Sequence, residues 1–302
     1  MKISKKILAL LVILLLVLLG WFAVVKLKPN NPDNQIRVVA AENFWGSLIN
    51  QIGGNRVNVT SVISNPNIDP HEYESNSADA IAISKAQLVV VNGEGYDSWA
   101  SQLVSASPSS DRQVLNIAHF LNQPTGANPH FWYNPSYVNR VDLKVTSLLI
   151  KIDPSSKSYF EHNLNLLNSK MQSYLNIIKF IKSHYPNEKV AATESIFVYM
   201  AHAMGLDLIS PPAFITAVAE GNDPPAPSVV EFENQLNQHQ VKLLVYNVQT
   251  VTPLTSMIRS IALKDKIPVV GISETIQPPN LSFENWMKIE VTNIEQGLSL
   301  KK

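Results

Sequence analysis

The sequence predicts an α/β fold with two lobes, each a mostly parallel sheet flanked by helices and joined by one long linking helix. Short runs rich in valine, isoleucine and leucine alternate with helical segments on both sides of this helix. Such runs are typical of parallel strands that are covered on both faces. We therefore expect an N-terminal lobe over residues 36–152, the linking helix over 153–185 and a C-terminal lobe over 186–302.

The chain opens with an apolar segment that is long enough to cross a bilayer. Residues 7–25 carry no charge and stand between lysines. As a helix they would extend about 28 Å, close to the hydrocarbon thickness of a membrane. A cleaved secretory signal is the alternative, although its apolar core would be shorter and its cleavage site less bulky. We expect 1–28 to be a transmembrane anchor or a signal and 29–35 a tether, with the rest of the chain extracytoplasmic.

Each predicted element of the lobes has a local signal. In the N-terminal lobe, Gly53-Gly54 ends the first helix and Ser77 opens the second. The expected order there is strand 36–40, helix 44–52, strand 57–63, helix 77–86 and strand 88–91. After the linking helix it is strand 189–193, helix 196–204, a proline-rich loop 210–227, helix 228–240, strand 241–246, helix 253–264, strand 268–272 and helix 282–298.

The linking helix is predicted by a long stretch without an internal glycine or proline. From Pro154 to Tyr185, apolar residues recur mostly at steps of three and four, as one face of a helix requires. Asp153 is a suitable N-cap, and Pro186 stands beyond the far end. A helix of this length would extend about 45 Å, enough to join two lobes.

Composition limits the chemistry open to this chain. The sequence contains no cysteine, which excludes disulfides, thiolate metal sites, thiol nucleophiles and lipid attachment through cysteine. Any metal ion must therefore be held by His, Asp, Glu or water. The 24 basic and 24 acidic residues balance, so net charge does not favour nucleic acid or anionic lipid as a partner.

Four side chains are candidate metal ligands: His71, His130, Glu194 and Glu274. The glutamates follow predicted strands of the C-terminal half, and the histidines lie in loops of the N-terminal half. Ligands of open parallel sheets bind beyond the carboxyl ends of the strands, so one cleft between the lobes would bring the four together. Each also has a simpler explanation: His71 as a surface histidine, His130 as a stacked histidine, Glu194 as a carboxylate that caps a helix start and Glu274 as an exposed turn carboxylate.

Two neutral imidazoles and two carboxylates would neutralise a divalent cation. Manganese, iron and zinc suit this donor set, because calcium and magnesium prefer oxygen ligands alone. If both carboxylates bind through two oxygens, the coordination number approaches six and manganese is favoured. If each binds through one oxygen, the site is a tetrahedral zinc cage. The sequence leaves both open.

The remaining histidines and the acids beside His71 have other expected roles. Five histidines fall in segments where structural roles are expected: His119, His162, His184, His202 and His239. Glu72 and Glu74 could accept a hydrogen bond from a metal-bound histidine or simply face solvent.

The sequence resembles the metal-binding solute-binding proteins of ABC importers, the family of zinc and manganese receptors and several streptococcal adhesin-like lipoproteins. The resemblance covers residues 36–298 and is carried by Asp69-Pro70-His71-Glu72-Tyr73-Glu74, Asn128-Pro129-His130-Phe131-Trp132, Ala192-Thr193-Glu194-Ser195, Tyr246-Asn247-Val248-Gln249-Thr250 and Val270-Gly271-Ile272-Ser273-Glu274-Thr275. It implies two α/β lobes joined by a rigid helix, with the two histidines contributed by the first lobe and the two glutamates by the second.

Three departures from the family pattern matter. Glu274 stands where many members carry aspartate, which leaves the coordination number open, and Glu194 replaces the third histidine of zinc-type receptors, which favours manganese. Asn134 stands where aspartate is common. There is also no lipobox cysteine, so the N-terminal segment would provide the tether.

The resemblance implies an extracytoplasmic receptor that captures manganese or zinc as a transported ligand and delivers it to an ABC permease in the membrane. We expect a monomer that is not an enzyme and has no organic cofactor. One alternative is a surface adhesin or interaction module with a structural metal. Another is a metallohydrolase, for which only Glu72 could be nominated as base and no His-Glu-x-x-His motif occurs.

Overall fold

The computed structural model describes residues 35–68 and 70–300. The predicted anchor at 1–28 and the tether up to residue 34 lie outside the described residues. By its internal contacts the chain divides after Gln35, and the part that begins at Ile36 is one compact unit. Over the described ranges, no helix is both long and apolar enough to cross a membrane.

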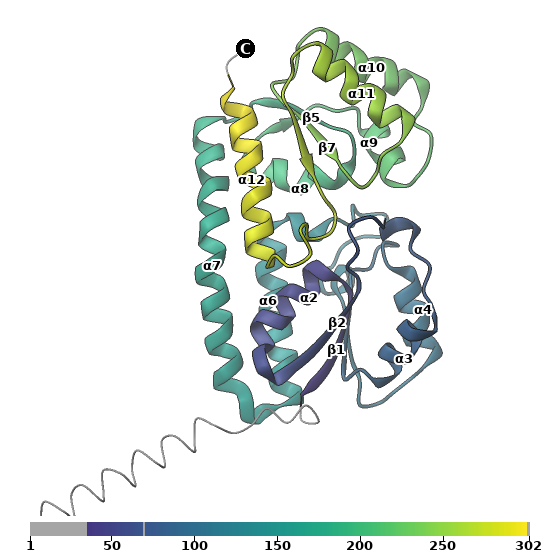
Figure 1. The fold of residues 1–302 in the computed structure, drawn as a ribbon, viewed down its shortest axis with the longest axis vertical. Coiled ribbons are helices and arrows are strands. Elements are labelled where there is room, and N and C mark those ends of the chain that lie inside the picture. Colours follow the sequence, from purple (N-terminus) through teal and green to yellow (C-terminus); the bar gives the residue numbers. More distant parts are fainter. Residues whose placement is uncertain (1–34, 69, 301–302) are drawn as a thin grey trace, which may run out of the picture. The chain divides into compact units, whose positions relative to one another are not determined.

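Two parallel four-stranded sheets with the same topology lie at the centres of two lobes (Figure 1). The N-terminal sheet has the order β2-β1-β3-β4, formed by β1 (Ile36–Glu42), β2 (Val57–Ile63), β3 (Leu88–Val91) and β4 (Gln113–Asn116). The C-terminal sheet has the order β6-β5-β7-β8, formed by β5 (Lys189–Ala192), β6 (Asp207–Leu208), β7 (Leu244–Asn247) and β8 (Val269–Ile272). The strand order reverses between β1 and β3 and between β5 and β7, which is where open parallel sheets bind ligands.

Helices connect the strands and cover both sheets, which confirms the predicted two-lobed α/β class. The N-terminal lobe contains α2 (Asn43–Gly53), α3 (Ser77–Lys85), α4 (Ser98–Ala106), α5 (Ile117–Leu121) and α6 (Pro135–Ile152). After the long helix α7 (Lys157–His184) come α8 (Val198–Met204), α9 (Pro212–Ala219), α10 (Ala226–Asn237), α11 (Pro253–Lys264) and α12 (Phe283–Ser299). Three short 3₁₀ turns adjoin the predicted ligands: η3 (Pro70–Glu72), η4 (Phe131–Tyr133) and η6 (Ser195–Phe197).

The long helix α7 packs against elements of both lobes. It contacts α2 and α6 on the N-terminal side and α8 on the C-terminal side, and α12 lies alongside it (Figure 1). Its buried face consists of Phe160, Leu164, Leu167, Met171, Tyr174, Ile178 and Ile181. This face belongs to a single apolar cluster that also includes strands of both sheets. Because tertiary packing of an apolar face supplies most helix stability in proteins, the shared cluster explains how so long a helix persists.

Two predicted segments differ in kind from the structure, and five helices and strands were not among those predicted: α4, β4, α5, α6 and β6. The long helix begins at Lys157, because Asp153 caps a preceding 3₁₀ turn by accepting a hydrogen bond from the Ser155 N–H. The proline-rich loop expected over 210–227 contains α9, whose Phe214 is buried in the core of the C-terminal lobe. A proline at the first helical position, here Pro212, begins a helix more often than it interrupts one.

Candidate metal centre

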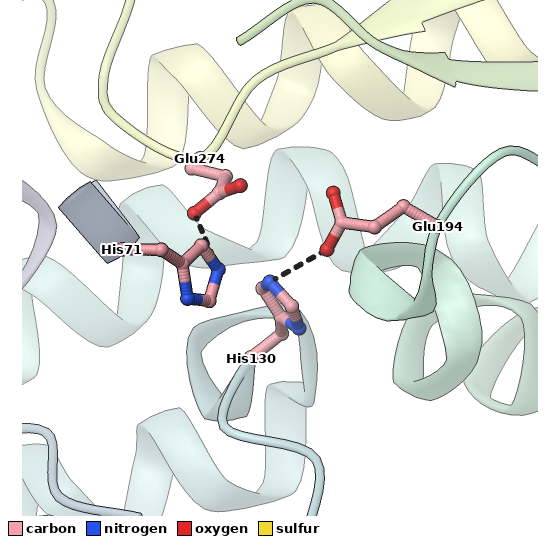
Figure 2. A group of neighbouring side chains, drawn as sticks. All are labelled: His71, His130, Glu194 and Glu274. Carbon is pink, nitrogen blue, oxygen red and sulfur yellow. Dashed lines mark ion pairs between the residues drawn. The ribbon is translucent and has the colours of Figure 1, made fainter. Parts of the chain in front are cut away.

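The structure brings all four candidate ligands together (Figure 2). His71 lies in η3 after β2, and His130 immediately precedes η4. Glu194 and Glu274 each stand two residues beyond a strand, β5 and β8 respectively. One potential ligand atom of each residue lies within 4.8 Å of all the others. Across the described residues this is the only such group of three or more His, Asp or Glu side chains.

The centre is closed on most sides. His130, Glu194 and Glu274 are at most 1% exposed, whereas the side chain of His71 keeps 23% of its surface in solvent. The alternative role of Glu274 as an exposed turn carboxylate is therefore wrong. Glu194 makes no capping hydrogen bond at the start of η6, so its alternative role as a helix cap is also wrong. His71 is the candidate ligand most open to solvent.

The four groups form two histidine–glutamate pairs (Figure 2). His130 Nε2 lies 3.2 Å from Glu194 Oε1, and His71 Nε2 lies 3.5 Å from Glu274 Oε2. Ligands placed tetrahedrally around zinc at about 2.0–2.1 Å are roughly 3.3 Å from one another. The nitrogen–oxygen distance in each pair matches this spacing. The limit of 4.8 Å that holds for all four ligand atoms is larger than the tetrahedral value.

Asn128 determines which nitrogen of His130 carries the proton. Its Nδ2 donates to the Ser195 carbonyl at 2.7 Å, and its Oδ1 accepts from the His130 backbone N–H at 3.1 Å. The same oxygen lies 2.6 Å from His130 Nδ1. Because the amide oxygen can only accept, we assign the proton to Nδ1, which leaves the Nε2 lone pair directed at the centre. Metal-binding histidines are typically oriented in this way, with the second ring nitrogen donating to an acceptor of the protein.

Burial keeps His130 neutral. Loss of water around the ring, and secondarily the neighbouring His71, lower the pKa of His130 well below its ordinary value. A neutral imidazole nitrogen and a carboxylate oxygen both offer lone pairs, so the 3.2 Å approach of Nε2 to Glu194 is not a conventional hydrogen bond. A cation bound to both atoms would turn this unfavourable contact into a favourable one.

Two residues to which sequence reasoning assigned no role hold the carboxylates. The Tyr96 hydroxyl donates to Glu274 Oε2 at 2.7 Å. Burial and then the charge of Glu274 raise the pKa of Tyr96 well above its ordinary value, so it remains a donor. Asn247 Nδ2 donates to Glu274 Oε1 at 2.8 Å and also to Glu194 Oε2. The position of Asn247 at the end of a strand could have indicated its role, as it did for the glutamates.

The other predicted roles can now be placed. Glu72 and Glu74 are exposed, which agrees with the solvent-facing alternative, and the acceptor beside His130 is Asn128. Asn134 caps α6, because its Oδ1 accepts hydrogen bonds from the backbone N–H groups of Ser136 and Tyr137. The five remaining histidines lie outside the cluster.

Comparison with known proteins agrees with the sequence motifs. The family model described as "ZnuA: Zinc-uptake complex component A periplasmic" matches residues 38–297. Among curated proteins, the chain is 23% identical to the metal ABC transporter substrate-binding lipoprotein FimA of Streptococcus parasanguinis, over 98% of this chain and 99% of that protein. It is 24% identical to the manganese ABC transporter substrate-binding lipoprotein PsaA of Streptococcus pneumoniae, with the same coverage. It is 21% identical to the high-affinity zinc uptake system protein ZnuA of Bacillus subtilis, over 78% of this chain and 79% of that protein.

Solved structures share the fold. A manganese-bound variant of a periplasmic metal-binding protein from Candidatus Liberibacter asiaticus superposes with a TM-score of 0.73 at 18% identity, covering 86% of this chain and 98% of that one. A crystal structure of ZnuA superposes with a TM-score of 0.68 at 18% identity, covering 88% of this chain and 100% of that one. These similarities confirm the two-lobed architecture.

Proposed function

Because this chain belongs to the ZnuA family of periplasmic zinc-uptake components, we propose that it is an extracytoplasmic receptor for a divalent transition metal. It captures zinc or manganese between its lobes and delivers the ion to the permease of an ABC importer. The metal is cargo, and the chain performs no chemistry on it. Relatives named for zinc uptake and for manganese transport support this pair of metals.

The observation that carries the proposal is the convergence of His71, His130, Glu194 and Glu274. Two histidines from the N-terminal lobe and two glutamates from the C-terminal lobe offer ligand atoms within 4.8 Å of one another. Such a donor set suits zinc and manganese rather than calcium or magnesium. Side chains from both lobes would surround the ion, and His71, at the solvent-exposed side, would be its point of entry.

Equilibrium dialysis of the full chain in detergent tests this function. We expect one bound ion per chain for zinc or manganese, and a loss of affinity of at least about 100-fold in Glu194→Ala, since removing mere hydrogen-bond partners of ligands already costs 10- to 100-fold. Glu284→Ala is the matched control, because Glu284 is a buried glutamate of the same lobe that bonds Gln51 instead. Equal uptake by the wild type and Glu194→Ala would refute the site.

A chelator distinguishes a receptor from an adhesin or interaction module with a structural metal. A transported metal ion should be removed and restored while the circular dichroism spectrum remains that of the folded chain. Removal of a structural metal would unfold the chain. The metallohydrolase alternative loses support because its only nominated base, Glu72, is exposed to solvent and is not one of the clustered side chains. Hydrolysis of activated esters by the metal-loaded chain, abolished in Glu194→Ala, would revive it.

We further propose that residues 7–25 hold this receptor, as a monomer, at the outer face of the membrane. The relatives named above from Streptococcus are called lipoproteins, but the sequence here contains no cysteine to which a lipid could be attached. We expect the full chain to stay in the membrane fraction through a carbonate wash and the chain without residues 1–28 to be released. Recovery of the full chain as a shortened soluble form would show instead that the segment is cleaved.

A further inference from the structure

We propose that Asn247 sets the coordination number of the metal centre by holding one oxygen of each glutamate away from the ion. Each carboxylate then binds through its other oxygen, and the centre is a four-coordinate site that prefers zinc to manganese. This inference rests on the proposed function, which it deepens by naming the preferred ion and the residue that selects it.

The orientation of the Asn247 amide is fixed by its own neighbours. Asn247 is the last residue of β7 and is 1% exposed. Its Oδ1 accepts a hydrogen bond from the Gln249 backbone N–H at 3.0 Å, so its Nδ2 must point the other way. There the single nitrogen donates to Glu194 Oε2 and, at 2.8 Å, to Glu274 Oε1. The same nitrogen also lies 3.0 Å from the Thr250 hydroxyl, so its two protons serve three acceptors, two of which are the candidate ligands.

The oxygens that Asn247 does not hold are the ones that face the histidines, and one of them, Glu274 Oε2, also accepts the Tyr96 hydroxyl. Glu194 Oε1 lies 3.2 Å from His130 Nε2, and Glu274 Oε2 lies 3.5 Å from His71 Nε2 (Figure 2). Two nitrogens and two oxygens are thus arranged around one point. Within each pair the spacing matches tetrahedral zinc, and all four donors lie within 4.8 Å of one another. A six-coordinate manganese ion held by these four side chains alone would use both oxygens of each glutamate.

Two-oxygen binding would require each carboxylate to turn, which would distort or break its bond to Asn247. Both carboxylates are buried, so an oxygen that turned toward the ion would cost the amide a charged partner that water does not replace, and would leave it the neutral Thr250 hydroxyl. Hydrogen bonds to charged groups are strong enough that the loss of one lowers an equilibrium constant by about tenfold or more. Thr250 adds to the restraint, since its hydroxyl lies 3.3 Å from Glu274 Oε1. Six-coordinate binding of manganese would require the loss of these hydrogen bonds, whereas four-coordinate binding of zinc would keep them.

The test compares zinc and manganese affinities of the full chain in detergent, measured by competition with chelators of known affinity. In Asn247→Ala we expect the zinc-to-manganese affinity ratio to fall by about tenfold or more, because the freed oxygens can join a larger coordination shell. Ser210→Ala is the matched control: its buried hydroxyl bonds only the backbone of Ala192 in the same lobe, so the ratio should stay at the wild-type value. An unchanged ratio in Asn247→Ala overturns the inference.

X-ray absorption spectroscopy on the wild type keeps the inference testable even if Asn247→Ala does not fold. We expect the zinc-loaded wild type to show four nearest nitrogen and oxygen neighbours. A zinc-loaded spectrum with five or six neighbours, or a wild type that prefers manganese, overturns the inference while leaving the receptor function intact. A wild type that binds neither ion overturns the proposed function, and the inference with it.

Discussion

Asn128 Nδ2 donates a 2.7 Å hydrogen bond to the backbone carbonyl of Ser195, the residue that follows Glu194. The same amide, through Oδ1, lies 2.6 Å from Nδ1 of His130. One side chain of the N-terminal lobe therefore orients a histidine of its own lobe and contacts the loop that carries a glutamate of the other. The same amide thus joins the two lobes and orients a candidate ligand.

Replacing Asn128 by alanine should lower metal affinity without unfolding the chain. His130 would lose the acceptor that keeps its proton on Nδ1, and ligands deprived of such a partner lose about 10- to 100-fold in metal affinity. Competition binding of zinc to Asn128→Ala measures the loss.

Asn134→Ala is the control for this substitution. Asn134 caps α6 and touches none of the four candidate ligands in the contacts described above. Its removal should cost about 1 kcal/mol of unfolding free energy and leave zinc affinity at the wild-type value. If both asparagine variants lost affinity equally, the effect of Asn128 would be structural and the assigned proton position would lose its support.

Gln249 should slow metal release. Its Oε1 accepts hydrogen bonds from the backbone N–H groups of Glu274 and Thr275, and its Nε2 donates to the carbonyl of Ile68 in the loop before His71. Gln249→Ala removes all of these hydrogen bonds together. We therefore expect zinc to dissociate about tenfold faster in a stopped-flow experiment with a chelator.

Gln277→Ala is the matched variant for release. Gln277 also reaches the N-terminal lobe, but only through a 3.4 Å contact with the carbonyl of Pro66. Its release rate should stay within about twofold of the wild type, since so long a contact contributes little. Equal acceleration by both substitutions would assign the effect to general loosening between the lobes rather than to Gln249.

Metal should raise the melting temperature of the wild type. A ligand at about 100 times its dissociation constant adds ~2.7 kcal/mol of unfolding free energy, which for a chain of this size corresponds to roughly 5–10 °C. Differential scanning fluorimetry with zinc should show this rise, and Glu194→Ala should show none. A rise of equal size in the variant would mean that zinc stabilises the fold from another site.

The metal-free chain should lose stability as pH rises, because of Glu290. Burial raises the pKa of Glu290 to about 8, from an ordinary value of 4.5. Between these values the folded chain holds a proton that the unfolded chain has released, so the unfolding free energy falls with pH, by at most about 1.4 kcal/mol per pH unit. Glu290→Gln mimics the protonated acid and should remove this component. Urea titrations at pH 5.5, 6.5 and 7.5, with chelator present, measure how the unfolding free energy of the wild type and of Glu290→Gln changes with pH. Equal pH dependence in the two proteins would contradict the assignment.

Much of the fold follows from local sequence. Strands rich in valine and isoleucine, the glycine pair after the first helix and the apolar face of the long helix indicate two parallel sheets around a spine, because these patterns act over a few residues. The helix α9 was missed because proline is common both in loops and at the first position of helices.

The sequence by itself determined which chemical groups are available and which ends of the sheets present them. With no cysteine and with histidines and glutamates placed after strands, a nitrogen and oxygen centre was the only kind of metal site open to the chain. Only the tertiary structure decided which oxygen of each glutamate faces a histidine. That choice depends on Asn247, which lies 53 residues from Glu194 and 27 from Glu274. Contacts across such separations arise from the packing of whole strands, whereas local patterns specify only the elements themselves.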